Sequence, residues 1–168
     1  MNVILTGAPR TGKTTIIHKI IIKIDKECTG FYTEEINERN QRAGFKLITL
    51  DNKSCVLAHK DIKKRYRVGK YGVNLDCIEK IGVSAIRKGM EQNKIVIIDE
   101  IGKMELFSTE FKDIVIKALD SNSKVLGTIL FRPHPFCDRI KHRKDVAIIE
   151  VTEENRDFLP EILLKKFI

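Results

Sequence analysis

The chain has 168 residues, 42% of them hydrophobic and 32% charged, and carries a net charge of +8. This length suits one domain with a real core, so we expect a single domain over residues 1–168. The composition excludes a disordered chain, and because no long apolar run or leader-like N-terminus is found, we expect a cytoplasmic protein without a membrane partner.

Strands and helices alternate along the chain, which favours an α/β fold with a mainly parallel sheet flanked by helices. Short apolar runs indicate the strands, and apolar residues at i, i+4 spacing indicate the helices. The predicted strands are residues 3–6, 31–36, 94–99, 124–130 and 146–151. The predicted helices are residues 13–26, 74–91, 109–119 and 153–167, with Asn74 and Ser108 as caps of the second and third.

Between the first strand and the first helix, residues 7–14 (Gly-Ala-Pro-Arg-Thr-Gly-Lys-Thr) match the Walker A pattern. Gly7 and Gly12 permit backbone angles and a close approach that a side chain would block. The loop N–H groups form an anion site, in which Lys13 reaches the β- and γ-phosphates and the Thr14 hydroxyl binds Mg²⁺. The predicted phosphate-binding residues are Gly7, Ala8, Pro9, Arg10, Thr11, Gly12, Lys13, Thr14 and Thr15.

Residues 37–73 follow a different pattern. Residues 44–51 and 55–59 are typical of antiparallel strands joined by a turn, so we predict an antiparallel extension at one edge of the sheet. A basic, glycine-spaced segment follows and contains Arg67, Lys70 and Tyr71. This segment can be a nucleic-acid patch or part of a triphosphate pocket, but a glycine-bent hairpin tip explains it more simply.

The apolar strand that starts at Lys94 ends in two acids, Asp99 and Glu100. In P-loop proteins the strand-end aspartate holds Mg²⁺, usually through its water shell. A glutamate directly after it can orient and deprotonate the attacking water. This pair is typical of RecA-like ATPases, so we expect residues 124–130 to lie between the strands at 3–6 and 94–99. A kinase must keep water from the γ-phosphate, and Glu100 argues against one.

Three further residues are candidates near the γ-phosphate. Lys103 can stabilise transition-state charge, as an arginine finger does, or form a surface ion pair with Glu105. Arg132 follows the strand at 124–130, and we favour a catalytic role for it over that of a solvated loop arginine. Thr128 can sense the phosphate from the same strand, but we interpret it as a core residue.

The last predicted helix begins near Thr152, where Asn155 and two glutamates suit a helix start. A contact of Asn155 or Arg156 with the base or ribose is the weaker interpretation.

The cysteines and the net charge are less informative than the motifs. Because Cys28, Cys55, Cys77 and Cys137 lack metal-ligand spacing, we expect plain thiols in a reducing compartment. A charge of +8 can indicate a nucleic-acid partner, but the lysines are spread along the chain and there is no tryptophan. We therefore favour a solvated basic surface plus a triphosphate site, and nucleic acid stays an open alternative.

With both motifs placed, the chain resembles the P-loop nucleoside-triphosphatases first described from thermophiles, called cancer-related nucleoside-triphosphatases in animals. The matching segments cover residues 30–35, 44–45, 69–74, 98–106, 134–135 and 152–156, and the Asp-Glu-Ile-Gly-Lys-Met-Glu string is the most specific. The resemblance implies a RecA-like sheet and slow, Mg²⁺-dependent hydrolysis of ATP, GTP and other triphosphates to the diphosphate. Arg10 departs from the family, which commonly has glycine there, and leaves the loop's detailed phosphate contacts open.

We therefore predict a Mg²⁺-dependent hydrolase of ATP, GTP, CTP and UTP, with no base-reading motif to select among them. The predicted catalytic residues are Glu100, Lys13, Lys103 and Arg132, and the predicted Mg²⁺ ligands are Thr14 and Asp99. Two alternatives stay open. One is a phosphotransferase that acts on a nucleotide, a nucleoside or a nucleic-acid end, and the other is a non-enzymatic nucleotide-dependent switch that signals through residues 37–73.

Overall fold

The computed structural model describes residues 1–24 and 28–167, and their strands form one nine-stranded sheet in the order β5-β6-β4-β3-β2-β7-β8-β1-β9. Strands β2, β7, β8, β1 and β9 run parallel, and β3, β4, β5 and β6 continue the sheet in antiparallel fashion. The strands are β1 (Asn2–Thr6), β2 (Cys28–Glu38), β3 (Gln41–Thr49), β4 (Ser54–His59), β5 (Arg67–Val68), β6 (Tyr71–Val73), β7 (Ile95–Ile101), β8 (Val125–Ile129) and β9 (Val146–Glu150).

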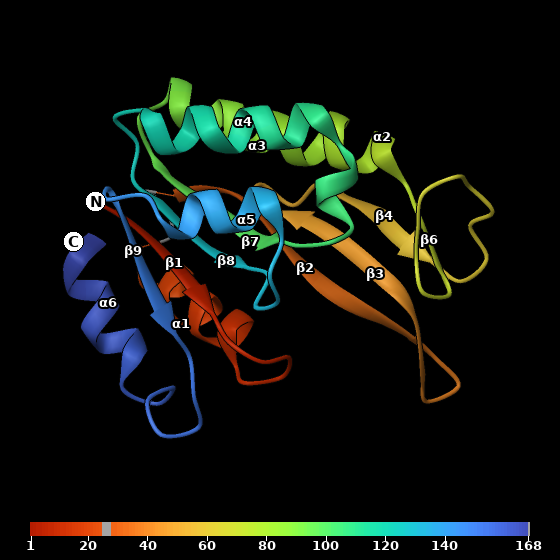
Figure 1. Cartoon of the computed structure of the whole chain (residues 1–168), viewed down its shortest axis with the longest axis horizontal. Helices are drawn as coiled ribbons and strands as arrows, with labels where there is room; N and C mark the ends of the chain where they lie inside the picture. The colour runs from red at the N-terminus through yellow and green to blue at the C-terminus, as the bar shows by residue number, and fades with distance from the viewer. Residues whose placement is uncertain (25–27, 168) are drawn as a thin grey trace.

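Helices cover both faces of the parallel part (Figure 1). Helices α1 and α6 lie on one face, and α3, α4 and α5 lie on the other, while the antiparallel strands extend beyond them at the far end from the two termini. The helices are α1 (Lys13–Ile24), α2 (Leu75–Cys77), the π-helical η2 (Ile78–Val83), α3 (Ser84–Glu91), the 3₁₀ turn η3 (Glu105–Phe107), α4 (Thr109–Asp120), α5 (Pro135–Lys141) and α6 (Leu159–Phe167).

Alternate residues of the central strands supply the two halves of the core. On β7, Val96 and Ile98 pack with α3 and α4, whereas Ile95 and Ile97 pack with α1 and α6. Both faces are buried because a parallel strand is covered by helices on either side, which explains the unbroken apolar run in the sequence. The predicted strand order is confirmed, since β8 lies between β1 and β7. The predicted antiparallel extension is confirmed as well.

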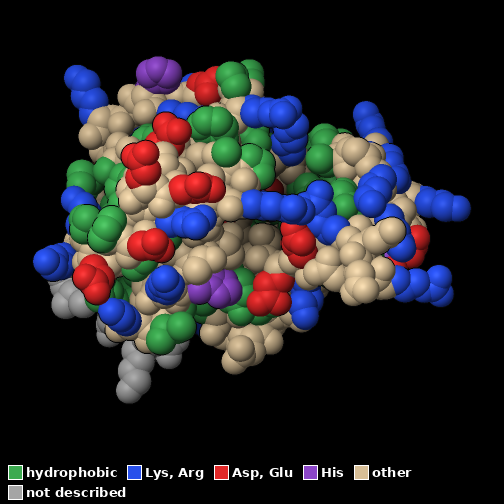
Figure 2. Space-filling model, turned by 90° about the horizontal axis from the view of Figure 1, so that it is seen from below, with side chains coloured by type: hydrophobic (Ala, Val, Ile, Leu, Met, Phe, Trp, Pro, Cys, Tyr) green, Lys and Arg blue, Asp and Glu red, His purple; other side chains and the backbone are tan. Residues whose placement is uncertain are grey.

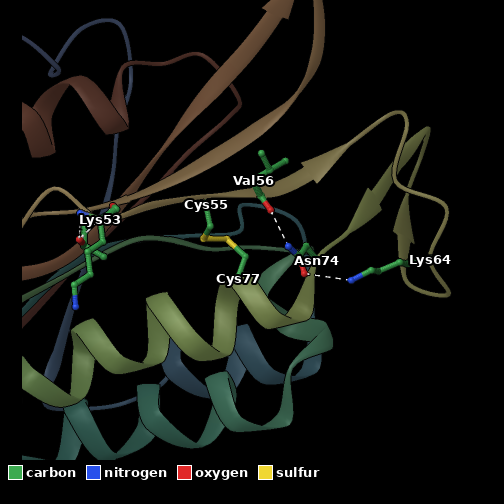
Figure 3. Close-up of a disulfide and its surroundings, with 7 residues drawn as sticks. Lys53, Cys55, Val56, Lys64, Asn74 and Cys77 are labelled. Carbon is green, nitrogen blue, oxygen red and sulfur yellow. Dashed lines mark hydrogen bonds between the residues drawn. A yellow bond between two sulfur atoms is a disulfide. The ribbon is translucent and has the colours of Figure 1, made fainter.

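One predicted helix start is wrong, and one predicted cap makes no capping hydrogen bond. Asn74 precedes a continuous helical stretch, but its side chain donates to the carbonyl of Val56 and accepts from Lys64 instead of capping the helix (Figure 3). The last helix begins at Leu159 and not at residue 153. There, the Asn155 side chain accepts from the Thr152 amide at 2.9 Å and donates to the carbonyl of Glu150 at 2.8 Å, which stabilises a turn before the helix.

Other element boundaries differ less. Ser108 caps α4 as predicted, since its hydroxyl accepts from the Phe111 amide at 3.1 Å. Helix α5 was not predicted from the sequence, and it begins with His134 as its cap and Pro135 in the first turn. Helix α1 ends at Ile24, and the rest of the helix expected up to residue 26 lies outside the described residues.

A disulfide joins Cys55 of β4 to Cys77 of α2 and ties the antiparallel extension to the helical layer (Figure 3). The prediction of four plain thiols is therefore wrong for this pair. The two cysteines are separated by 22 positions in the sequence and meet only because β4 and α2 pack together. Cys28 and Cys137 are not in disulfides, and both are buried.

None of the helices in residues 1–24 and 28–167 combines the length and the apolar character needed to cross a membrane.

Candidate functional site

The Walker A residues form a loop between the end of β1 and the start of α1. Gly7 and Gly12 have φ angles of +138° and +101°, which glycine adopts without strain. A Cβ added at Gly7 would lie 2.6 Å from the carbonyl oxygen of Val151, so the loop also needs glycine for close approach to the end of β9. Arg10 has a φ of +64°, in the left-handed region that glycine adopts more freely than arginine.

Lys13 lies within the curve of this loop. Its Nζ donates to the carbonyl oxygens of Gly7 and Ala8, at 2.8 Å each. Burial lowers the pKa of Lys13 below its usual value, and the charges of Glu100 and Asp99 oppose that shift. The ammonium group therefore contacts the phosphate loop and is also subject to the charges of the two acids of β7.

Asp99 lies at the end of β7 and is 2% exposed. Its Oδ1 accepts from the Thr128 hydroxyl at 2.6 Å, while its Oδ2 is buried without a hydrogen-bond partner among the described residues. Burial raises the pKa of Asp99, and the Thr128 and Thr14 hydroxyls oppose that rise. A buried carboxylate oxygen that lacks a partner is costly, and a cation or its bound water would satisfy it.

Thr128 is buried, as the core interpretation expects, but it does more than fill space. Its hydroxyl holds the Asp99 carboxylate from the neighbouring strand β8. A threonine that faces the acidic strand end from an adjacent parallel strand is the sequence signal that could have identified this role.

Glu100 follows Asp99 and borders an open cavity at the same edge of the sheet. Burial raises its pKa, the charge of Asp99 raises it further, and Lys13 lowers it. Gly102 packs directly against this side chain, so that an added Cβ would overlap Glu100 Oε1. Glu100 is thus a partly exposed carboxylate whose proton affinity is raised by its surroundings.

Glu105 is a second buried carboxylate next to Glu100, and the sequence analysis did not predict it. It is 4% exposed, and its Oε2 accepts from the Gly102 amide at 3.2 Å. Burial, together with the charge of Glu100, raises the pKa of Glu105 to about 8. The alternative of a surface ion pair between Lys103 and Glu105 is wrong, because Glu105 lies inside the protein and Lys103 is exposed.

These residues surround a cavity of about 880 Å³. Most of the predicted site residues line it, namely Gly7, Pro9, Arg10, Gly12, Lys13, Thr14, Thr15, Glu100, Lys103 and Arg132. Ala8 and Thr11 belong to the loop but not to the cavity wall, and Asp99 is buried beneath it. The edge of the sheet to which β1 and β9 point lies at the bottom of Figure 1, and Figure 2 views the molecule from that side.

Another part of the cavity wall comes from the parallel strand β2 and from the antiparallel extension, and none of its residues was predicted from the sequence. Thr33, Glu34 and Glu35 of β2 line it, together with Arg42 and Phe45 of β3 and Val68 of β5. Arg42 is held by an ion pair with Glu35 at 3.3 Å and a bond to the Tyr71 hydroxyl at 3.0 Å. The extension therefore completes the cavity beyond the phosphate loop.

On the other side of the loop, Arg156 lies beside Gly12, since an added Cβ there would be 3.7 Å from Arg156 Cδ. Asn155 uses both of its side-chain groups in the local turn. Of the two residues considered for a base or ribose contact, only Arg156 has a side chain that is not engaged in this turn.

The arrangement of loop, acidic strand end and cavity can be compared with known proteins. The sequence profile of the NTPase family matches residues 2–164. The chain belongs to this family. A relative from Thermotoga maritima named nucleoside-triphosphatase THEP1 is 46% identical over 164 residues, which cover 97% of this chain and 94% of that protein.

Two solved NTPase structures have the same fold. The crystal structure of THEP1 from Aquifex aeolicus superposes with a TM-score of 0.91 at 38% identity and covers 99% of both chains. The solution structure of a human cancer-related nucleoside triphosphatase gives a TM-score of 0.83 at 35% identity, over 98% of this chain and 96% of that one. The resemblance noted in the sequence is thereby confirmed, as is the fold.

Proposed function

We propose that this NTPase-family chain hydrolyses nucleoside triphosphates to the diphosphate and phosphate with the help of Mg²⁺. The observation that carries the proposal is Glu100, a carboxylate with a raised pKa that borders the same cavity as Lys13 and the phosphate loop. The relatives, which are named nucleoside-triphosphatases, support the same reaction. Broad use of ATP, GTP, CTP and UTP follows from a site that recognises mainly phosphates.

The residues present fit a magnesium ion. Thr14 and Asp99 offer the hard oxygen ligands that Mg²⁺ prefers, and Asp99 Oδ2 is buried without a partner among the described residues. Since Mg²⁺ usually takes one or two protein ligands and completes its shell with phosphates and water, two such residues suffice. When bound, the ion neutralises charge that develops on the β- and γ-phosphates.

The chain's own residues then divide the remaining tasks. The loop amides and Lys13 bind and orient the phosphates. Glu100 accepts the proton of the attacking water, a task for which a raised pKa is suited because the base must hold that proton near neutral pH. Lys103 and Arg132 line the same cavity, and we assign them to stabilise charge on the transferred phosphoryl group.

The phosphotransferase and the switch are alternatives that an experiment can separate from the hydrolase.

A cytoplasmic location also stays a proposal, and the Cys55–Cys77 disulfide is more typical of an oxidising compartment.

Two substitutions test the mechanism. Glu100→Gln should retain nucleotide binding and lose about 10²- to 10⁴-fold in hydrolysis, because glutamine keeps the size but is too weak a base. Asp99→Asn should instead raise the Mg²⁺ concentration needed for turnover. Single-turnover hydrolysis and nucleotide binding are measured across a Mg²⁺ titration. Normal turnover by Glu100→Gln would contradict the mechanism, label transfer to an added acceptor would indicate a kinase, and binding without turnover by the parent protein would indicate a switch.

A further inference from the structure

The positive charge of this protein is concentrated in one short segment. Residues 60–70 contain six Lys or Arg and one Asp, so that this segment, here called the basic loop, carries +5 of the chain's net charge of +8. The lysines are indeed spread along the whole chain, but elsewhere acidic residues nearly balance them. A solvated basic surface with evenly spread charge therefore does not describe this segment.

The cations of the basic loop are exposed and largely without acidic partners. Lys60 pairs with Glu38 at 2.9 Å. Among the described residues, no carboxylate lies within 4.0 Å of the other five charged groups, which belong to Lys63, Lys64, Arg65, Arg67 and Lys70. Figure 2 shows Lys and Arg side chains that project from the end of the molecule formed by the antiparallel extension.

The backbone of the basic loop is held in place by its own contacts. The Arg67 guanidinium donates to the carbonyl oxygens of Ile62 and Lys70, at 2.9 and 2.8 Å. Gly72 allows Ile62 to pack so closely that an added Cβ would overlap the Ile62 carbonyl. The Tyr66 ring packs against Phe107 with 5.1 Å between centroids. The cations therefore project from an ordered backbone, which lowers the entropy lost when a ligand binds.

The basic loop is also next to the triphosphate cavity. Val68, between Arg67 and Lys70, lines that cavity together with Phe131 and Arg132 from the other side. Phe131 is 45% exposed and offers a face on which a base can stack. A flexible anionic chain that contacts the basic loop can thus reach an exposed aromatic ring at the rim of the cavity.

We propose that the basic loop binds the phosphate backbone of single-stranded nucleic acid. Cations without nearby acids suit a repeating phosphate chain, and Phe131 suits an unpaired base. An anionic membrane surface is less suited, because the apolar residues of the loop do not project outward: Ile62 packs on Gly72 and Tyr66 on Phe107. An acidic protein would be expected to meet a mixture of charges and apolar groups, which this loop does not present.

The test compares two triple variants with the same change in net charge. Lys63→Gln, Arg65→Gln and Lys70→Gln lower the charge of the loop from +5 to +2 and leave Arg67 and Lys64 in their hydrogen bonds. The control replaces three exposed lysines elsewhere, Lys117, Lys144 and Lys165, by Gln. Binding of labelled oligothymidylate and oligouridylate is measured by fluorescence anisotropy over a range of salt concentrations.

We expect the parent and the control to bind with similar affinity and similar salt dependence. The loop variant should lose about tenfold in affinity, and the slope of log affinity against log salt should fall by about 2, because each phosphate contact on a single strand contributes ~0.7 to that slope. Hydrolysis of ATP without nucleic acid should be the same in all three proteins, which checks that the loop variant is folded and that binding is tested independently of the proposed reaction.

Three results would overturn the proposal. The first is no oligonucleotide binding by the parent protein. The second is equal loss of affinity in the loop variant and the control, which would indicate a response to net charge alone. The third is loop-dependent binding to phosphatidylserine vesicles or to polyglutamate with none to oligonucleotides, which would assign the surface to a membrane or to an acidic protein.

Discussion

Gly102 contacts two carboxylates of the site, those of Glu100 and Glu105. Its amide donates to Glu105, and an added Cβ would overlap the carboxylate of Glu100. Gly102→Ala should therefore displace the Glu100 side chain, with little loss of stability because the displaced atoms are the end of a flexible chain. We expect kcat to fall about 10- to 100-fold, since a shift of about 1 Å in a catalytic group has effects of this size.

The measurement is steady-state hydrolysis beside urea unfolding. Gly69→Ala is the control for the rate, because an added Cβ there meets no atom within 4 Å. Its φ of +56° strains alanine, so its urea midpoint should fall while its rate stays at that of the parent. A parent rate for Gly102→Ala would show that the position of Glu100 does not limit the reaction.

Glu105 links the site to the pH dependence of stability. Its pKa is about 8 in the folded protein and near 4.5 in the unfolded chain, so between these values only the folded state holds the proton. Stability should therefore fall as pH rises through this window, by about 1.4 kcal/mol per pH unit for this group alone, and stop falling above pH 8. Asp99 and Glu100 also have raised pKa values and add to the same trend.

Glu105→Gln should flatten this dependence, because a neutral amide keeps an acceptor for the Gly102 amide and does not titrate. Urea unfolding at intervals from pH 5 to pH 8 measures the free energy of unfolding of both proteins. Relative to the parent, the variant should become more stable as the pH approaches 8. Glu161→Gln, an exposed site, should leave the curve unchanged. An unchanged slope in Glu105→Gln would mean that Glu105 is ionised in the folded protein.

At the scale of elements, the disulfide fastens β4 to the start of the helical stretch α2–η2–α3. It closes a loop across a sequence separation of 22, which in chain-entropy terms stabilises the fold by about 3 kcal/mol. Reduction should lower the urea midpoint of the parent protein accordingly. The double variant Cys55→Ser, Cys77→Ser should unfold at the lower midpoint with or without reductant, and a midpoint of the parent that ignores reductant would contradict this role.

The sequence predicted those strands and helices that a short motif or a regular apolar spacing marks. The Walker A loop marks the end of β1, and the Asp-Glu pair marks the end of β7. Because this pair is typical of RecA-like ATPases, the order β1-β8-β7 could be predicted from the two motifs. Helix α5 was missed because it has only seven residues and is capped by a His134 ring nitrogen that accepts from the Phe136 amide, an unusual cap. The start of α6 was misplaced because Asn155 suits a turn as well as a helix cap.

Other features depend on contacts between distant segments and have no local signal. Glutamate is almost never fully buried, so the sequence could not predict a buried Glu105. The pairing of Cys55 with Cys77 requires the register of β4 against the sheet and the placement of α2. The wall of the cavity formed by Arg42, Phe45 and Val68 requires the extension to fold toward the phosphate loop, which alternation of residues along each strand does not specify.

At the scale of the whole molecule, the cavity joins two parts of the sheet. The phosphate loop and Glu100 belong to the parallel part, and Thr33 to Glu35, Arg42 and Val68 form the facing wall. A triphosphate binds this cavity in the folded state only, because the unfolded chain does not bring the two walls together. Binding must therefore raise the free energy of unfolding of the entire chain.

The size of this effect separates binding from chemistry. A non-hydrolysable ATP analogue with Mg²⁺ at one hundred times its Kd should stabilise the parent by about 2.7 kcal/mol. Glu100→Gln should be stabilised equally, since its charge is not needed for binding, whereas Lys13→Ala should lose most of the effect while its own fold persists, because alanine suits the first turn of α1. Thermal unfolding with and without the analogue measures this stabilisation in each protein, and a repeat with EDTA measures the part that requires Mg²⁺. If Lys13→Ala were stabilised as much as the parent, the nucleotide would bind outside the phosphate loop, and the roles assigned to Thr14, Asp99 and Glu100 would fall with it.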